Sequence, residues 1–190
     1  MIFVLMGKSG SGKSSIEREI GNLRQDFYRI ISDTTRPIRE GEKEGQDYHF
    51  VSEEFFLKGI ENGDYIEHTN YNNWYYGINK KYINLELGDY ICVTNPSGYK
   101  QLKKQFGDEV VGIVIHTDDK QRLLNYLNRE EKPNCYECCR RFLADAKDFA
   151  EVENDSTLHH VVNIFGDINA TIKILLSFID KAMEDRDAKH

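Results

Sequence analysis

Short apolar runs and amphipathic segments alternate along most of the chain. The apolar runs cover residues 2–6, 27–31, 89–93, 110–115 and 160–164, and their length and composition are typical of buried strands. Apolar residues at helical spacing follow them and predict helices over residues 13–23, 97–106, 118–128, 135–152 and 168–179. The charged tail, 181–190, is expected to fray. Strands that alternate with helices in this order predict an α/β fold with a parallel core sheet.

Residues 32–84 interrupt this alternation with a different pattern. The stretch 32–45 is polar and punctuated by proline and glycine, which predicts a loop. A short strand, a helix capped by a serine and an aromatic hairpin are expected after it, at residues 48–51, 53–62 and 65–77. The insertion is therefore predicted to consist mostly of small strands.

The pattern as a whole predicts a single domain, 1–190, built from three parts. The core is expected to comprise residues 1–31, 85–120 and 155–185, and the inserted β-rich region residues 32–84. Two helices within 121–154 are joined by a charged link, and such a pair can move as a lid.

Charge and composition narrow the classes of partner. The chain of 190 residues has 25 Lys and Arg against 32 Asp and Glu, and its formal charge is −7. This balance argues against a protein that coats nucleic acid or an anionic membrane, so a bound anion must be held by a local cluster. The sequence has no charged N-terminal region followed by a long apolar segment, which argues against a signal peptide or a membrane span. A cytoplasmic protein is therefore expected.

Three of the four cysteines are crowded into one predicted helix. They are Cys135, Cys138 and Cys139, and the fourth is Cys92. The CxxC spacing allows a zinc site, but a second paired motif is absent. Reduced, structural thiols are the favoured interpretation.

A glycine-rich segment, Gly7 to Ser15, directly follows the first apolar run and matches the P-loop pattern GxxxxGK[ST] at every fixed position. Its glycines permit a turn tight enough for successive N–H groups to face one phosphate, and the helix after it points its positive end at that anion. Lys13 places a cation on the β- and γ-phosphates, and Ser14 offers a hydroxyl to Mg²⁺. The flanking strand and helix patterns argue against a chance match. The predicted nucleoside triphosphate site comprises Gly7, Lys8, Ser9, Gly10, Ser11, Gly12, Lys13, Ser14 and Ser15.

A second anion site is predicted in the polar insertion. Arg36 and Arg39 are three residues apart in a loop of an acidic protein, and they can form a bidentate clamp for a second phosphate. Tyr48 and Tyr76 can add phenolic hydroxyls, and Glu67 can accept hydrogen bonds from the N1–H and amino group of a guanine. The alternative is that the arginines form surface ion pairs with nearby glutamates and that the tyrosines only pack.

These motifs together resemble those of guanylate kinases. Residues 32–51 follow the pattern SxTTRxxRxGExxGxDYxFV, and with the P-loop and the IE…YYG hairpin the similarity extends across essentially the whole chain. The resemblance implies a P-loop NTPase fold with a parallel core sheet, an inserted β-rich region that binds GMP and a helical lid. It implies transfer of phosphate from ATP to GMP with Mg²⁺, with these two nucleotides as the partners.

The resemblance also implies roles for individual residues. The GMP phosphate would be held by Ser32, Arg36, Arg39, Tyr48 and Tyr76, and the guanine by Glu67, with Glu42 supporting the pocket. Arg129 and Arg141 match the lid arginines that close over the ATP phosphates, and Asn163 matches an asparagine beside the adenine. The expected catalytic residues are Lys13, Arg36, Arg129 and Arg141.

Two positions depart from the family pattern. Ile78 stands where guanylate kinases usually carry Ser or Thr to contact guanine O6, and Val93-Thr94-Asn95 stands where an Asp-x-Asp is common. Ile78 keeps open a kinase for another nucleotide or for a sugar phosphate. A non-catalytic interaction module with a guanylate-kinase-like fold is disfavoured because the P-loop is intact. Monomer and homodimer both stay open.

Overall fold

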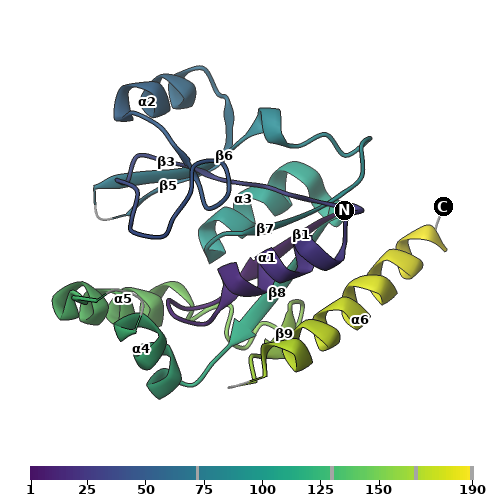
Figure 1. Cartoon of the computed structure of the whole chain (residues 1–190). Helices are drawn as coiled ribbons and strands as arrows, with labels where there is room; N and C mark the ends of the chain where they lie inside the picture. The colour runs from purple at the N-terminus through teal and green to yellow at the C-terminus, as the bar shows by residue number, and fades with distance from the viewer. Residues whose placement is uncertain (72, 129–130, 165–166, 189–190) are drawn as a thin grey trace.

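A five-stranded sheet forms the centre of the molecule (Figure 1). The structure is a computed structural model that describes residues 1–71, 73–128, 131–164 and 167–188. The strand order is β2-β7-β1-β8-β9, and every neighbouring pair is parallel, which confirms the predicted parallel core. The strands are β2 (Phe27–Arg29), β7 (Asp89–Val93), β1 (Ile2–Met6), β8 (Val110–His116) and β9 (His159–Val162).

The central strand β1 is buried on both faces. Phe3 and Leu5 pack in one apolar cluster with α1 (Lys13–Leu23) and α6 (Ile168–Asp187), whereas alternate residues of β1 face a second cluster with α3 (Pro96–Phe106). This two-sided burial explains the continuous apolar run, because neither face of the strand contacts water.

The insertion forms a separate four-stranded sheet of order β4-β3-β6-β5. The predicted hairpin is confirmed and is longer than expected, with β5 (Tyr65–Tyr71) antiparallel to β6 (Trp74–Asn79). The predicted helix is α2 (Glu53–Glu61), capped by Ser52. The loop predicted over 32–45 contains a short strand, β3 (Asp33–Thr34), which pairs with both β6 and β4 (His49–Phe50). Two residues are too few for a periodic signal, and their pairing is set by the neighbouring strands.

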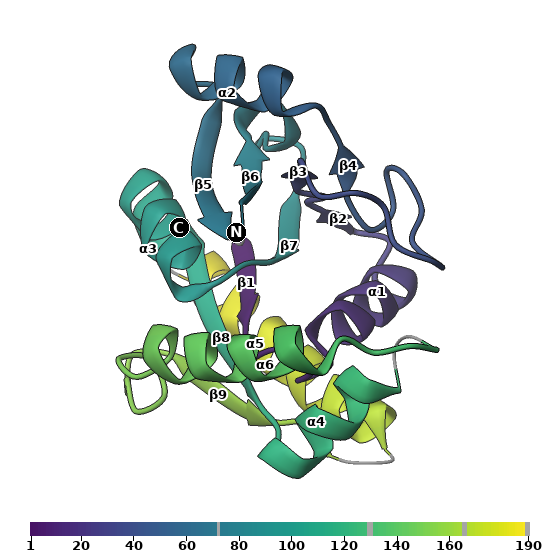
Figure 2. The same ribbon diagram turned by 90° about the vertical axis from the view of Figure 1, so that its left-hand side faces the viewer.

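Two helices, α4 (Asp119–Leu127) and α5 (Cys135–Asp148), lie at the end of the molecule away from α2 (Figures 1 and 2). Helix α5 ends four residues earlier than predicted. Beyond it the chain turns toward the core, and Phe149 and Val152 are buried in the second apolar cluster, the one on the α3 side of the core sheet. Two short 3₁₀ helices, Lys80–Tyr82 and Gly107–Glu109, complete the elements.

The prediction of a frayed tail is wrong for residues 181–187. Helix α6 continues to Asp187, with Ala182 and Met183 packed against the core. Arg186 Nη1 donates to Asp89 Oδ1 at 2.7 Å, at the start of β7. The segment is mostly charged, and Ala182 and Met183 alone carry its apolar contacts, so no clear helical pattern is present there in the sequence.

The four cysteines differ in their exposure to solvent. Cys92 and Cys138 are buried, whereas Cys135 and Cys139 are exposed, and the four thiols are free. Within the described ranges no group of three or more His, Cys, Asp or Glu side chains is arranged to hold a metal ion. None of the described helices is both long and apolar enough to cross a membrane.

Candidate active site

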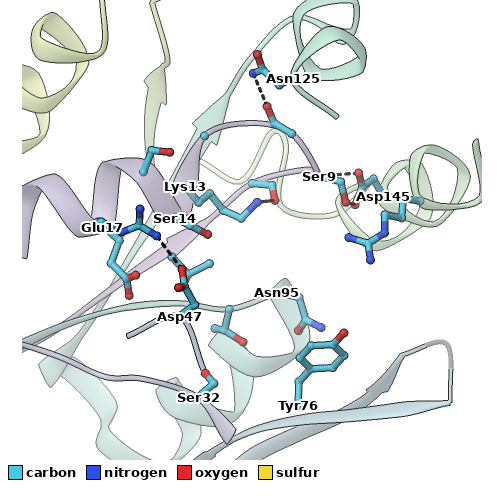
Figure 3. A pocket seen from close by; sticks show the side chains of 18 of the residues that line it. Ser9, Lys13, Ser14, Glu17, Ser32, Asp47, Tyr76, Asn95, Asn125 and Asp145 are labelled. Carbon is cyan, nitrogen blue, oxygen red and sulfur yellow. Dashed lines mark hydrogen bonds and ion pairs between the residues drawn. The ribbon is translucent and has the colours of Figure 1, made fainter. Parts of the chain in front are cut away.

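A cavity of about 930 Å³ lies where the P-loop, the inserted sheet and the helices α4 and α5 meet. Lys13 and Ser14 project into it between Ser32 and Tyr76 on one side and Asn125 and Asp145 on the other (Figure 3). The predicted site residues that line it are Gly7, Ser9, Gly10, Gly12, Lys13, Ser14, Ser15, Ser32, Arg36, Arg39, Glu42, Tyr48, Glu67, Tyr76, Arg141 and Asn163. Arg129 lies outside the described residues.

The P-loop leaves the start of α1 open to a ligand. The residue before the helix is Gly12 at φ 88°, and no side chain caps the first turn. The other five α-helices that the structure describes each begin with a capping side chain, from Ser52, Asn95, Asp118, Asn134 and Asp167. Lys13 curls back over the loop, where its Nζ donates to Gly7 O at 2.5 Å and to Lys8 O at 3.0 Å. Uncapped N–H groups beside an ammonium group suit an anion.

Two residues of the predicted triphosphate site, Lys8 and Ser11, do not line this cavity. Lys8 forms an ion pair with Glu153. Ser11 is buried, and its carbonyl oxygen accepts from Asn163 Nδ2 at 3.0 Å and from Thr117 Oγ1 at 3.2 Å. Both residues therefore attach the loop to neighbouring segments of the protein.

The arginine clamp of the insertion is built around a buried ion pair. Both terminal nitrogens of Arg36 donate to Glu42 at 2.9 Å, and the Arg39 N–H donates to the same carboxylate at 2.9 Å. Burial alone would raise the pKa of Glu42, but the hydrogen bonds from Arg36 and Arg39 hold it below its ordinary value. Arg36 thus pairs with one of the glutamates that the alternative named, but the pair is buried and lines the cavity, so it is not the surface ion pair of that alternative.

Aromatic rings complete the clamp. The Tyr48 and Tyr76 rings meet edge to face at 5.9 Å, and the Arg36 guanidinium lies 5.3 Å from the centre of the Tyr48 ring. The pairing of β3 with β6 sets this arrangement, because it places Thr34 opposite Tyr76 and so brings the arginine loop beside the hairpin.

Glu67 is a buried carboxylate on β5 without a full set of partners. Glu67 is 3% exposed, and its Oε2 has no hydrogen-bond partner among the described residues. Burial raises the pKa of Glu67 to about 7, although a hydrogen bond with Thr94 acts in the opposite direction. An orphaned acceptor of this kind is costly unless a ligand supplies the donor.

The two departures from the family pattern lie in different surroundings. Ile78 is fully buried in the second apolar cluster and does not line the cavity. Asn95 does line it, and its Oδ1 accepts from the Gly98 N–H at 2.8 Å, which caps α3. The position of Ile78 is therefore part of the core, and Asn95 is the departing residue that faces a ligand.

Sequence reasoning missed two charged pairs beside the P-loop. Glu17 is buried and accepts from Arg29 Nη2 at 3.0 Å, and Arg18 Nη2 donates to Asp47 at 2.7 Å. Desolvation raises the pKa of Glu17 against the effect of Arg29. The spacing of Glu17 three residues after Ser14, on one helix face, was the available signal. Asp47 stood in the quoted pattern of residues 32–51 as a fixed position, but nothing in the sequence connected it with Arg18, which is distant in the chain.

Arg141 faces the cavity from α5. Its Nε donates to Glu137 Oε1 at 2.8 Å, and its guanidinium lies 5.7 Å from the ring centres of both Tyr71 and Tyr126. The hydrogen bond from Arg140, together with one from Arg141, lowers the pKa of Glu137 to about 2. The guanidinium is thus oriented by a charged partner on its own helix.

Comparison with known proteins places this site in a family. The family model described as guanylate kinase matches residues 1–182. The chain belongs to the guanylate kinase family. The family is one of nucleoside monophosphate kinases, and the resemblance seen in the sequence motifs is confirmed.

Individual members of the guanylate kinase family align with much of the chain. A guanylate kinase from Wigglesworthia glossinidia brevipalpis is 32% identical over 201 residues, which cover 93% of this chain and 97% of that protein. One from Wolinella succinogenes is 37% identical over 125 residues, or 64% of this chain. The crystal structure of guanylate kinase from Anaplasma phagocytophilum has a TM-score of 0.67 at 26% identity, and the match covers 95% of this chain and 85% of that one.

The extent of these alignments differs among relatives. The aligned part is 58% of the Wolinella succinogenes protein, 62% of one from Helicobacter hepaticus and 66% of one from Legionella pneumophila. The chain thus spans less than two thirds of the length of these three relatives.

Proposed function

We propose that this protein transfers the γ-phosphate of ATP to GMP and forms ADP and GDP. The observation that carries the proposal is one cavity lined both by an intact P-loop and by the Arg36–Glu42 clamp with Glu67 behind it. A donor triphosphate and an acceptor monophosphate would thus meet in one cavity. Relatives that align with the chain are named guanylate kinase, which supports GMP as the acceptor.

The proposed site residues divide between the two nucleotides. Residues 7–15 would bind the ATP phosphates and Asn163 would lie near the adenine. Region 32–84 would bind GMP, with Ser32, Arg36, Arg39, Tyr48 and Tyr76 on its phosphate and Glu67 on its base. Residues 121–154 would act as the lid, and Arg141 would reach the phosphates from α5.

The proposed chemistry needs no strong base. A GMP phosphate oxygen, which is anionic at neutral pH, attacks the γ-phosphorus in line. A bond forms between that oxygen and the phosphorus, and the bond from the γ-phosphorus to the bridging oxygen breaks, so that ADP leaves. Lys13, Arg36 and Arg141 compensate the charge on the transferring group. Closure excludes water, which would otherwise compete as the acceptor.

Magnesium fits the oxygen donors on this side of the cavity. Ser14 lines it with a hydroxyl, and Glu17 places a carboxylate one helical turn further along α1. Mg²⁺ prefers such oxygen ligands together with water and phosphate oxygens. When bound, the ion would neutralise charge on the β- and γ-phosphates, with Ser14 as its protein ligand.

A coupled assay of ADP release with Mg·ATP tests the proposal. The acceptors are GMP, dGMP, AMP, CMP, UMP and none. Turnover with GMP is expected to exceed that with AMP, CMP and UMP by about 100-fold or more, because Glu67 pairs with donors that only guanine presents together. Lys13→Met is expected to lower kcat by roughly 100- to 1000-fold. Preference for a different acceptor, or ATP hydrolysis alone, would contradict GMP as the substrate.

A further inference from the structure

Three consecutive residues of the P-loop contact the lid helices or the turn after them. The contacts join Lys8 to Glu153, Ser9 to Asp145 and Gly10 to Asn125. The loop is therefore attached to 121–154 at the edge of the cavity, where Ser9, Asn125 and Asp145 lie among the residues that line it (Figure 3).

Asp145 of α5 is the centre of this attachment. Its Oδ2 accepts from the Ser9 N–H at 2.7 Å and from Arg122 Nη2 at 2.6 Å, and its Oδ1 accepts from Ser9 Oγ at 3.3 Å. Arg122 Nε donates to the Ser9 carbonyl oxygen at 2.9 Å. The Arg122–Asp145 pair therefore binds both the N–H and the C=O of Ser9. Arg122 is 2% exposed and Asp145 8% exposed. Buried charges persist only when they are paired and hydrogen-bonded in this way.

The backbones of the loop and of α4 also approach closely. Gly10 has φ 79°, and a Cβ placed there would lie 2.5 Å from the Arg122 carbonyl oxygen. The Arg122 guanidinium in turn lies 4.3 Å from the centre of the Phe142 ring on α5. The loop, α4 and α5 therefore form a packed unit around the Arg122–Asp145 pair.

Arg141 depends on the position of this unit. It precedes Asp145 by four residues on α5, so both side chains lie on one face of the helix, one turn apart. Asp145 is bound to the P-loop, and Arg141 faces the cavity in which the phosphates would lie. The bond from Ser9 to Asp145 thus fixes both the rotation of α5 and the distance of Arg141 from the loop.

We infer that Asp145 is a positioning residue for phosphoryl transfer: with Arg122 it fastens α5 to Ser9 and thereby orients the Arg141 guanidinium over the phosphates. The inference rests on the proposed function, because Asp145 acts on the reaction only through Arg141. It assigns to residues 121–154 an attachment to the P-loop at Ser9.

A double-mutant cycle tests this role. Asp145→Asn keeps an oxygen for the Ser9 N–H but removes the charge that pairs with Arg122. It is expected to lower kcat about tenfold, because small displacements of a catalytic group are costly, and to change the KM for GMP by less than about twofold. Arg141→Ala is expected to lower kcat by roughly 100-fold or more. In the Arg141→Ala background, Asp145→Asn should cost less than about twofold further, since residues that act as one unit are not additive.

Glu151→Gln is the matched control. It also neutralises a carboxylate of an ion pair near α5, but Glu151 and its partner Lys100 are exposed, at 2.5 Å from each other. Its kcat should equal that of the wild type, because exposed pairs contribute little. All rates are measured well below the thermal midpoint of each variant. If Asp145→Asn does not fold, the pair Arg122→Met with Asp145→Leu removes both charges, and the same cycle with Arg141→Ala applies to it.

Two results would overturn the inference. One is a folded Asp145→Asn variant with the kcat of the wild type, and the other is a full tenfold loss that persists in the Arg141→Ala background. A wild-type protein that phosphorylates no acceptor would contradict the proposed function instead, so the two failures are distinguishable.

Discussion

At the scale of single residues, the burial of Glu67 is the feature with the clearest consequence. Its Oε2 lacks a partner among the described residues, and its pKa of about 7 results from desolvation. An ordinary exposed glutamate would be fully ionised at neutral pH. Here a proton and a ligand that donates hydrogen bonds compete for the same carboxylate.

The affinity for GMP is expected to rise with pH up to about 7 and then to level off. The guanine N1–H and amino group need the ionised carboxylate, so the proton on Glu67 must leave before the base binds. At pH 6 the dissociation constant should be about tenfold larger than at pH 8, because most Glu67 is then protonated. Calorimetric titration with GMP between pH 5.5 and 8.5 measures this.

Glu67→Gln supplies the control for this measurement. The phosphate of GMP loses its second proton near pH 6, and this ionisation affects the wild type and the variant alike. The ratio of the two dissociation constants therefore isolates Glu67. A ratio that stays constant over the whole pH range would exclude a titrating Glu67 in the base pocket.

At the scale of elements, the first turn of α3 connects the core to Glu67 on β5, the residue proposed to bind the guanine base. Asn95 caps this turn, and the next residues lie against β5 of the inserted sheet. A Cβ on Gly98 would lie 2.1 Å from Thr94 Oγ1 and 2.7 Å from Glu67 Oε2. A glycine is thus required here by the close approach of a carboxylate to a helix, at an ordinary helical conformation.

Gly98→Ala is therefore expected to displace Glu67 and Thr94 and to raise the KM for GMP by about tenfold or more. The KM for ATP should change much less, because the P-loop lies on a different element. Ser97→Ala changes the neighbouring, exposed position of the same turn and should leave both constants near those of the wild type. Steady-state kinetics with each substrate varied in turn checks this, and equal rises in both constants would argue against a local effect on the base pocket.

At the scale of the whole molecule, the inserted sheet and α5 meet at the cavity. Tyr71, on β5, has the Arg140 guanidinium 4.4 Å from its ring centre and the Arg141 guanidinium at 5.7 Å. On the opposite side of the cavity, Arg18 of α1 binds Asp47 of the insertion. The contact of Tyr71 joins the inserted sheet to α5, and that of Arg18 joins the insertion to the core, so the insertion is held from both sides of the cavity.

Tyr71→Ala is expected to weaken the contact between the inserted sheet and α5. A cation–π contact of this kind contributes about 1 kcal/mol, so kcat for GMP phosphorylation should fall roughly fivefold to tenfold. ATP hydrolysis without GMP should rise relative to transfer, because the cavity excludes water less well. Tyr71→Phe keeps the ring but loses the hydroxyl that hydrogen-bonds with Arg140, so it should lie between the wild type and Tyr71→Ala in both assays. An unchanged ratio of transfer to hydrolysis in Tyr71→Ala would show that this contact does not close the site.

Much of the fold followed from patterns that act locally. The strand of residues 2–6, the P-loop and the helix after it were predicted in order, because a buried strand, a glycine turn and an amphipathic helix each have their own signal in consecutive residues. The resemblance to guanylate kinases rested on residues 32–51 in the same way. Short strands such as β3 were missed, because two residues have no period and their pairing depends on β4 and β6.

The sequence by itself determined which groups can bind phosphate, because the residues of the P-loop and of the clamp are close together in the chain. Tertiary structure alone decided which distant groups join them. Asp145 reaches Ser9 across 136 positions, and Glu67 lies against the first turn of α3. Burial and pairing of charge depend on these neighbours, so neither the raised pKa of Glu67 nor the attachment of α5 has a signal in a local pattern.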